Sequence, residues 1–160
     1  MKQLGEMTVR DYMAEELVVV DDTSRLTAAI RLMDQRQLSV IPVVDAQENL
    51  VGILSNSDLM GMVHEIQGDL CALRHVNEKT REFLIQLLLD QGDVTKVLDV
   101  MSSPVETISS DANIVVAAKK LNDLKIHHLP VVDSAGRAIG MLSTSDFVRA
   151  IAELGALSAG

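Results

Sequence analysis

Serine and aspartate side chains recur at a fixed spacing in two short segments of this 160-residue sequence. Each segment follows an apolar run typical of a strand and precedes a run with helical spacing. A turn of this kind presents backbone N–H groups and the positive end of a helix dipole, which attract phosphate, and the serines add hydroxyl donors. The aspartate in the first helical turn would accept hydrogen bonds from a vicinal diol such as a ribose. These residues are Ser55, Ser57 and Asp58 in the first segment and Ser143, Ser145 and Asp146 in the second.

The same spacing has a purely structural alternative. Ser-x-x-Asp before an apolar helix is close to a capping box, in which the serine and the acid satisfy each other's backbone donors. On one copy alone, the capping interpretation is favoured over a binding site.

The two segments belong to a longer internal repeat. An apolar-Pro-Val-Val-Asp run starts at Ile41 and again at Leu129, and the offset of 88 residues holds without a gap over roughly 55 residues. Such self-similarity indicates internal duplication, so we expect the same fold twice. Extending the alignment toward the N-terminus pairs Val9, Asp11 and Met13 of the first copy with Val97, Asp99 and Met101 of the second.

Each copy is predicted to form strand, helix, strand, strand and helix, which is an α/β (α+β) fold. Because each small sheet has apolar side chains on both faces, we expect the two units to pack sheet to sheet with pseudo-twofold symmetry. Pro42 predicts an edge position or a strand start, since proline donates no ladder hydrogen bond. The expected strands are 17–20, 40–44 and 50–54 in the first copy and 105–108, 126–132 and 138–142 in the second.

Capping residues and apolar stripes mark the helices. Thr23 or Ser24 is expected to cap the first helix, and 109–111 the matching helix of the second copy. The expected stripes are Leu26, Ala29, Ile30 and Met33; Leu59, Met62, Val63 and Ile66; Ile114, Ala117, Ala118 and Leu121; and Phe147, Ala150, Ile151 and Leu154.

The predicted organisation is a first unit with a loose lead-in (1–66), a helical linker (67–95) and a second unit (96–160). Within the linker, 76–89 has an apolar stripe that includes Leu84, and Gly92 is a plausible stop. We expect this helix to pack on the pair of units or on a partner chain rather than to act as a disordered spacer.

Composition excludes several classes of function. The net charge of -9 and the aromatic content of 2% disfavour a nucleic-acid or anionic-membrane surface. Cys71 is the single cysteine, expected to be a small helix-core residue, so no intrachain disulfide or cysteine-based zinc cluster is expected. Apolar runs are too short for a membrane span, and no signal peptide is recognisable, which predicts a soluble cytoplasmic protein.

Taken together and duplicated, the Pro-Val-Val-Asp and Gly-apolar-apolar-Ser-x-x-Asp motifs resemble the CBS domain, over 9–63 and 97–151. The whole chain is similar to a tandem CBS pair, or Bateman module. That resemblance implies a regulatory module that binds AMP, ADP, ATP or S-adenosylmethionine between its two units and requires no cofactor. It assigns phosphate to the serines and ribose to the aspartates, while Asn56 and Thr144 occupy the variable position, with Thr144 included among the binding residues.

The resemblance also implies that the other wall of each cleft comes from the partner unit. The wall facing Asp58 contains two histidines, so we expect that cleft to hold the more anionic ligand, with pH-sensitive binding. Neighbouring strand residues point to opposite faces, so the two histidines are not expected to chelate a metal. The expected walls are Val19, Leu38, Ser39 and Val40 facing Asp146, and Thr107, Ile126, His127 and His128 facing Asp58.

No nucleophile–base pattern, P-loop or Gly-rich dinucleotide turn is present, so an enzyme is not expected. The apolar stripes at 59–66 and 147–154 predict a homodimer through helices, and the signal would pass to a regulated partner protein by conformational or oligomeric change. The alternative is a structural or protein-interaction module whose clefts stay empty.

Overall fold

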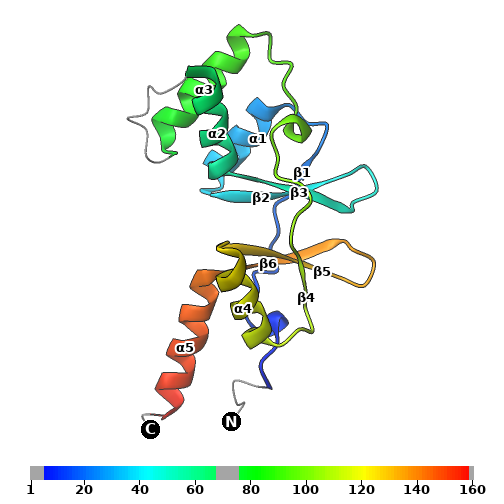
Figure 1. Cartoon of the computed structure of the whole chain (residues 1–160), viewed down its shortest axis with the longest axis vertical. Helices are drawn as coiled ribbons and strands as arrows, with labels where there is room; N and C mark the ends of the chain where they lie inside the picture. The colour runs from blue at the N-terminus through cyan, green and yellow to red at the C-terminus, as the bar shows by residue number, and fades with distance from the viewer. Residues whose placement is uncertain (1–5, 68–75, 159–160) are drawn as a thin grey trace. The chain divides into compact units, whose positions relative to one another are not determined.

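The computed structural model describes residues 6–67 and 76–158, apart from the side chains of residues 66–67 and 154–158 (Figure 1). The chain divides into two compact units, which are described separately. The first unit is Val18–Val105, and the second combines Met1–Leu17 with Glu106–Gly160.

The first unit contains a three-stranded sheet in the order β1-β2-β3. β1 runs parallel to β2, and β3 runs antiparallel to it. The helices of the unit lie against one face of this sheet (Figure 1). The elements are β1 (Val20–Asp21), α1 (Leu26–Gln35), β2 (Val40–Val44), β3 (Leu50–Ser55), α2 (Asn56–Gln67) and α3 (Glu78–Asp90).

The second unit repeats this topology with the sheet order β4-β5-β6 and the same pattern of one parallel and one antiparallel pair. The mixed α+β class and the order strand, helix, strand, strand, helix are therefore confirmed for both copies. The elements are β4 (Ile108–Ser109), α4 (Ile114–Leu124), β5 (His128–Val132), β6 (Ala138–Ser143) and α5 (Thr144–Ser158).

The core of each unit includes residues from the start of the other repeat. Met7, Val9 and Tyr12 are buried in the core of the second unit, so the described part of the lead-in is packed rather than loose. Val97 is likewise buried in the core of the first unit. The boundaries 1–66, 67–95 and 96–160 thus group the chain differently from these contacts, and stay a prediction about domain organisation.

The first strand and the first helix cap of each copy were predicted at the wrong residues. β1 and β4 lie at the end of, or beyond, the predicted ranges 17–20 and 105–108. Thr23 cannot cap α1 because its N–H and hydroxyl bond to Asp21, so Arg25 occupies the N-cap without a side-chain hydrogen bond. In the second copy Asn113 caps α4 by accepting the N–H of Val115 at 2.8 Å.

Pro42 lies in the central strand β2, so the expected edge position or strand start is wrong. The short strand β1 pairs only with Val43 and Val44. Pro42 therefore has a strand partner on one side alone, Ile53 of β3, and its missing N–H leaves no gap in the ladder with β1.

Helix α3, which lies between the repeats in sequence, belongs to the core of the first unit. Asn77 caps it by accepting the N–H of Thr80 at 3.0 Å, and Gly92 follows its end with φ of 86°. Leu84 and Leu88 are buried with the side chains of α1. The expected linker helix is thus confirmed, and it packs on the first unit.

The predicted helix stripes are buried only in part. Leu59, Val63 and Ala150 are buried, whereas Ile151 is 66% exposed. The Ile66 and Leu154 side chains and all of Cys71 lie outside the described residues. Within the described ranges, none of the helices is long and apolar enough to cross a membrane.

A glycine lets a neighbouring chain segment approach the last strand of each sheet. Ile53 exchanges two backbone hydrogen bonds with Ser102, at 3.1 and 2.9 Å. A Cβ at Gly52 would lie 2.6 Å from Met101 Sδ and 2.9 Å from the Ser102 carbonyl oxygen. The corresponding neighbours of Gly140 are Met13 and Ala14.

Replacing Gly52 by alanine is expected to lower the free energy of unfolding by about 1–3 kcal/mol, because the segment at Ser102 would have to move away. Urea denaturation measures the change. Gly61 is the matched control: it lies in α2, and a Cβ added there would meet nothing within 4 Å beyond its own helix backbone. Gly61→Ala should therefore stabilise the fold by about 0.5–1 kcal/mol. Equal effects of the two substitutions would contradict the close approach.

Candidate functional site

The first Ser-x-x-Asp turn joins β3 to α2. Asp58 Oδ2 accepts hydrogen bonds from the N–H and the hydroxyl of Ser55, at 2.7 and 2.6 Å. The other carboxylate oxygen, Oδ1, accepts the Ser102 hydroxyl at 2.6 Å. Ser57 is exposed. The carboxylate that could bind a diol is therefore oriented by two serines.

The second turn joins β6 to α5 and repeats the core of this geometry. Asp146 Oδ2 accepts the N–H and the hydroxyl of Ser143, at 2.7 and 2.8 Å, and the Ser143 and Ser145 hydroxyls are 2.7 Å apart. Oδ1 of Asp146 here bonds to the Arg149 guanidinium at 3.1 Å. This arginine also donates to the Tyr12 carbonyl, so a guanidinium bonds directly to the carboxylate of the second turn, whereas Oδ1 of Asp58 accepts a serine hydroxyl.

The first turn thus has both hydrogen bonds of a capping box, and the second has the one from the serine N–H to the aspartate. In the first turn the Asp58 N–H also reaches the Ser55 hydroxyl, at 3.4 Å. These contacts are the ones expected if the serines and aspartates only cap their helices. They also hold the serine hydroxyl and the carboxylate side by side at a helix N-terminus, where an anion is favoured.

The residues before β2 and β5 lie beside the turn of their own unit. The N–H of Asn56 donates to the Ser39 carbonyl at 2.9 Å, and the N–H of Thr144 donates to the His127 carbonyl at 3.1 Å. A hollow of about 330 Å³ adjoins the first turn and one of about 530 Å³ the second. The expectation that these residues face the aspartate of the other copy stays a prediction.

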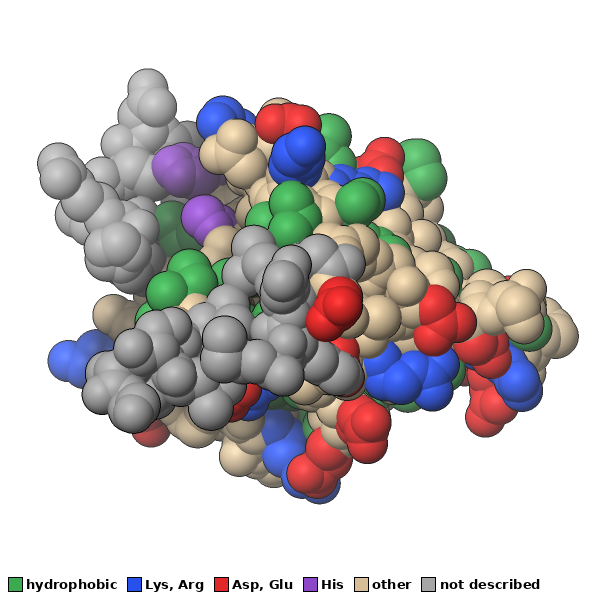
Figure 2. Space-filling view, turned by 90° about the horizontal axis from the view of Figure 1, so that it is seen from below, with side chains coloured by type: hydrophobic (Ala, Val, Ile, Leu, Met, Phe, Trp, Pro, Cys, Tyr) green, Lys and Arg blue, Asp and Glu red, His purple; other side chains and the backbone are tan. Residues whose placement is uncertain are grey.

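The two hollows differ in chemistry. The first is lined by polar side chains that include the buried Arg81. The second is mostly apolar, with Lys125 and His127 among its lining residues. Figure 2 shows histidine side chains next to hydrophobic ones on the face that it presents. Candidate residues among the lining are Leu38 and Ser39 in the first hollow and Ile126, His127 and Thr144 in the second.

The remaining candidates lie on strands or next to them. Val19 is 40% exposed just before β1, and Val40 is buried at the start of β2. Thr107 is half-buried, and its carbonyl accepts the Lys120 ammonium at 2.8 Å. His128 pairs with Ser143 across β5 and β6, which places it beside the second turn.

Burial lowers the pKa of His128 below its ordinary value of 6.5. The neighbouring His127 lowers this pKa further, whereas the negative charge of Asp146 opposes the shift. His128 is therefore neutral at pH 7. An anion that needs a charged imidazole at this position would bind better as the pH falls.

The lowered pKa of His128 predicts a loss of stability in acid. Between the folded pKa and 6.5 the unfolded chain binds more protons, so the free energy of unfolding should fall as the pH falls through this window. Urea denaturation between pH 7.5 and 5 should show a smaller loss for His128→Asn than for the wild type. An NMR titration of the His128 ring with a midpoint at or above 6.5 would contradict the assignment.

Three residues near the turns are not indicated by the local motifs. Arg149 stands where the first copy has Gly61, and Ser102 stands where the other repeat has Ala14. The repeat alignment could have singled out both as differences between the copies. Arg81 lies outside the duplicated region, so no repeat signal was available for it.

Two other expectations concern acidic residues. Asp45 and Asp133 are turn residues as predicted, because each carboxylate accepts backbone N–H groups of its own hairpin. In the described part of the chain, no three His, Cys, Asp or Glu residues form a group that could hold a metal ion.

The sequence matches the CBS domain family twice, at residues 9–65 and 97–153. The chain belongs to the CBS domain family. The two matches cover the duplicated motifs, and both Ser-x-x-Asp turns lie inside them.

Several relatives of this CBS-domain chain are similar along most of its length. The chloroplastic CBS domain-containing protein CBSX1 of Arabidopsis thaliana is 30% identical over 94% of the chain, which spans 66% of that protein. The uncharacterized protein MJ1426 of Methanocaldococcus jannaschii is 32% identical, with 91% of each covered. The crystal structure of CBSX2 in complex with AMP is 27% identical with a TM-score of 0.71, covering 92% of this chain and 98% of that one.

Proposed function

We propose that this chain is a regulatory module that binds an adenosine-type nucleotide at its two Ser-x-x-Asp turns. The ligand is AMP, ADP, ATP or S-adenosylmethionine. Serine hydroxyls and helix N-termini hold the phosphate or the corresponding polar group, and the aspartates hold the ribose. The walls expected from the opposite repeat, which would complete each site, remain part of this proposal.

The observation that carries the proposal is the repeated geometry of the two turns. In each turn, one carboxylate oxygen of the aspartate accepts the N–H of the serine three residues earlier, with 2.7 Å between the nitrogen and the oxygen. Among the described residues, the other oxygen bonds to one side chain that could be displaced, Ser102 in the first turn and Arg149 in the second. A ribose hydroxyl could take over that contact without breaking the cap.

The likeness to AMP-bound CBSX2 supports an adenosine ligand. The two proteins are 27% identical, and the likeness covers 92% of this chain. AMP is therefore the first ligand to test.

A regulatory role without catalysis fits the family, since CBS pairs are generally regulatory modules. We propose that the ligand changes the conformation or the oligomeric state, with a homodimer formed through helices and an unknown regulated protein as partner. Val148 and Ile151 on α5 are exposed, which suits an apolar interface. A cytoplasmic location, without nucleic-acid or membrane partners, stays a prediction, and CBSX1 is chloroplastic.

The structural alternative is an interaction module whose turns bind no ligand. The hydrogen bonds from the N–H groups of Ser55 and Ser143 to the aspartates favour it, because they account for the Ser-x-x-Asp spacing without a nucleotide. A binding experiment distinguishes the two functions.

A thermal-shift screen with AMP, ADP, ATP, S-adenosylmethionine and GMP tests the proposal. A ligand that binds only the folded state raises the melting temperature, and at a hundred times its Kd it adds about 2.7 kcal/mol. We expect a shift with at least one adenosine ligand and a smaller one with GMP. No shift with any ligand in a well-folded protein would favour the interaction module.

A further inference from the structure

Helix α3 contributes one charged side chain to the interior of the first unit. Arg81 is 8% exposed, and it lines the hollow beside the first turn. Burying a guanidinium is unfavourable unless its N–H groups find partners. The burial of Arg81 therefore depends on the groups that accept hydrogen bonds from its guanidinium.

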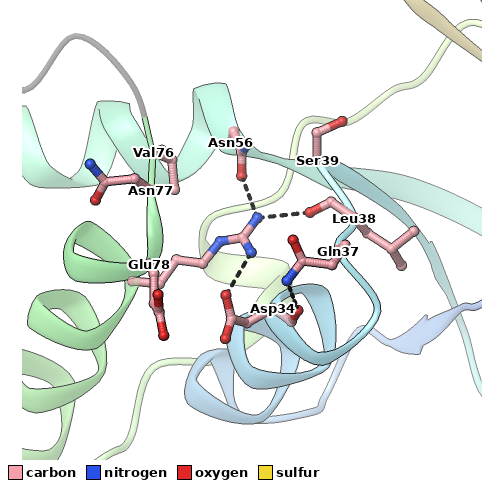
Figure 3. Close-up of a pocket in the computed structure, with 9 residues that line it drawn as sticks. Asp34, Gln37, Leu38, Ser39, Asn56, Val76, Asn77 and Glu78 are labelled. Atoms are coloured by element: carbon pink, nitrogen blue, oxygen red, sulfur yellow. Dashed lines mark hydrogen bonds and ion pairs between the residues drawn. The ribbon is translucent and has the colours of Figure 1, made fainter.

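Those groups come from three different segments. One guanidinium nitrogen pairs with the Asp34 carboxylate of α1 at 3.0 Å. The other donates to the Leu38 carbonyl at 2.8 Å and to the Asn56 side chain at 3.2 Å (Figure 3). Arg81 Nε is buried and without a hydrogen-bond partner among the described residues, so these contacts alone offset the burial.

The three contacts surround the proposed ligand turn. Asn56 stands inside the Ser55–Asp58 turn, and its N–H donates to the Ser39 carbonyl at 2.9 Å. Arg81 thus ties the segment before β2 and the start of α2 to helix α3. A displacement of α3 would remove a bond from each of them.

The second unit has no equivalent of this arginine among its described residues. Positions 88 residues after Asp34, Leu38 and Asn56 hold Asn122, Ile126 and Thr144. These residues line the mostly apolar hollow of about 530 Å³. Among the described residues, the arginine that connects a Ser-x-x-Asp turn to helix α3 is therefore found at the first turn and has no counterpart at the second.

We propose that Arg81 is a positioning residue that couples the docking of helix α3 to ligand binding at the first turn. This inference rests on the proposed nucleotide binding. A ligand that fixes the Ser55–Asp58 turn holds Asn56 in place for Arg81 and so stabilises docked α3. Reciprocally, a partner that pulls α3 away weakens ligand binding at this turn by the same factor.

Hydrogen–deuterium exchange of the α3 amides with and without saturating AMP tests the coupling. In the wild type, AMP should slow exchange in Leu84–Leu88 by about threefold or more. Arg81→Lys keeps the charge but not the planar fork, so the slowing should disappear while AMP still binds, as measured by calorimetry. The control is Gln86→Ala, which removes only the exposed contact of Gln86 with Asp90 and should keep the full effect.

The outcomes separate this inference from the proposed function. If AMP binds but slows α3 equally in all three proteins, or in none, the coupling is overturned and nucleotide binding stands. If AMP does not bind the wild type but ADP, ATP or S-adenosylmethionine does, the exchange experiment is run with that ligand; if none of the four binds, both are overturned. Should Arg81→Lys fail to fold, Asn56→Ser replaces it, because it removes only the 3.2 Å contact from the arginine.

Discussion

Replacing Leu84 by alanine should lower the free energy of unfolding by about 2–5 kcal/mol. Leu84 lies on α3 and is completely buried in the core of the first unit. Truncating it removes apolar contacts and leaves a cavity that the surrounding side chains of α1 cannot fill. Chemical denaturation followed by circular dichroism measures the loss.

Leu89 provides the matched control on the same helix. Its side chain is 42% exposed, so Leu89→Ala should change the free energy of unfolding by less than about 0.5 kcal/mol. Comparable small effects of both substitutions would mean that α3 is a connector rather than a part of the folded unit. The coupling proposed for Arg81 would then lose its basis.

Replacing both Asp58 and Asp146 by alanine should weaken AMP binding by about tenfold or more. A hydrogen bond to a charged group contributes about 1.5–3 kcal/mol, which corresponds to roughly 10–150-fold in affinity. Asp58→Ala should weaken binding at the first turn, and Asp146→Ala should weaken binding at the second. Isothermal titration calorimetry gives the affinity and the number of sites for all three variants.

The loss of a helix cap must be distinguished from the loss of a ligand contact. Asp99 serves as the control, because its carboxylate accepts the Lys96 N–H at 2.9 Å in a short 3-10 helix and not in a Ser-x-x-Asp turn. Asp99→Ala should cost stability but leave the AMP affinity within about twofold. Wild-type affinity in the double variant would show that the aspartates only cap their helices.

The repeat made most of the fold predictable from sequence. A gapless offset of 88 residues transfers every strand and helix of one copy to the other, and both copies have the expected order. The first strands were misplaced because they are only two residues long and are held by their parallel partners rather than by their own β-propensity. The cap of α1 was predicted at the wrong residue because the polar groups of Thr23 bond to Asp21 instead of to the helix.

The candidate site was predictable only where the chemistry is local. Ser55 and Asp58 are three residues apart, so the sequence alone indicates that they meet. Ser102 reaches Asp58 from 44 residues away, and Arg81 reaches Asn56 from 25 residues away. Such contacts depend on tertiary packing, which spacing along the chain does not reveal.

An NMR titration with AMP, followed through the backbone amides, tests the central claim most directly. Binding at the Ser-x-x-Asp turns should shift the amide signals of residues 55–58 and 143–146 more than those of the exposed hairpin turns at Asp45 and Asp133. Saturable shifts concentrated at one or both Ser-x-x-Asp turns would establish a nucleotide-binding module. No saturable shifts with AMP, or with ADP, ATP and S-adenosylmethionine in the same titration, or shifts confined to other surfaces, would contradict it and leave the serines and aspartates as helix caps.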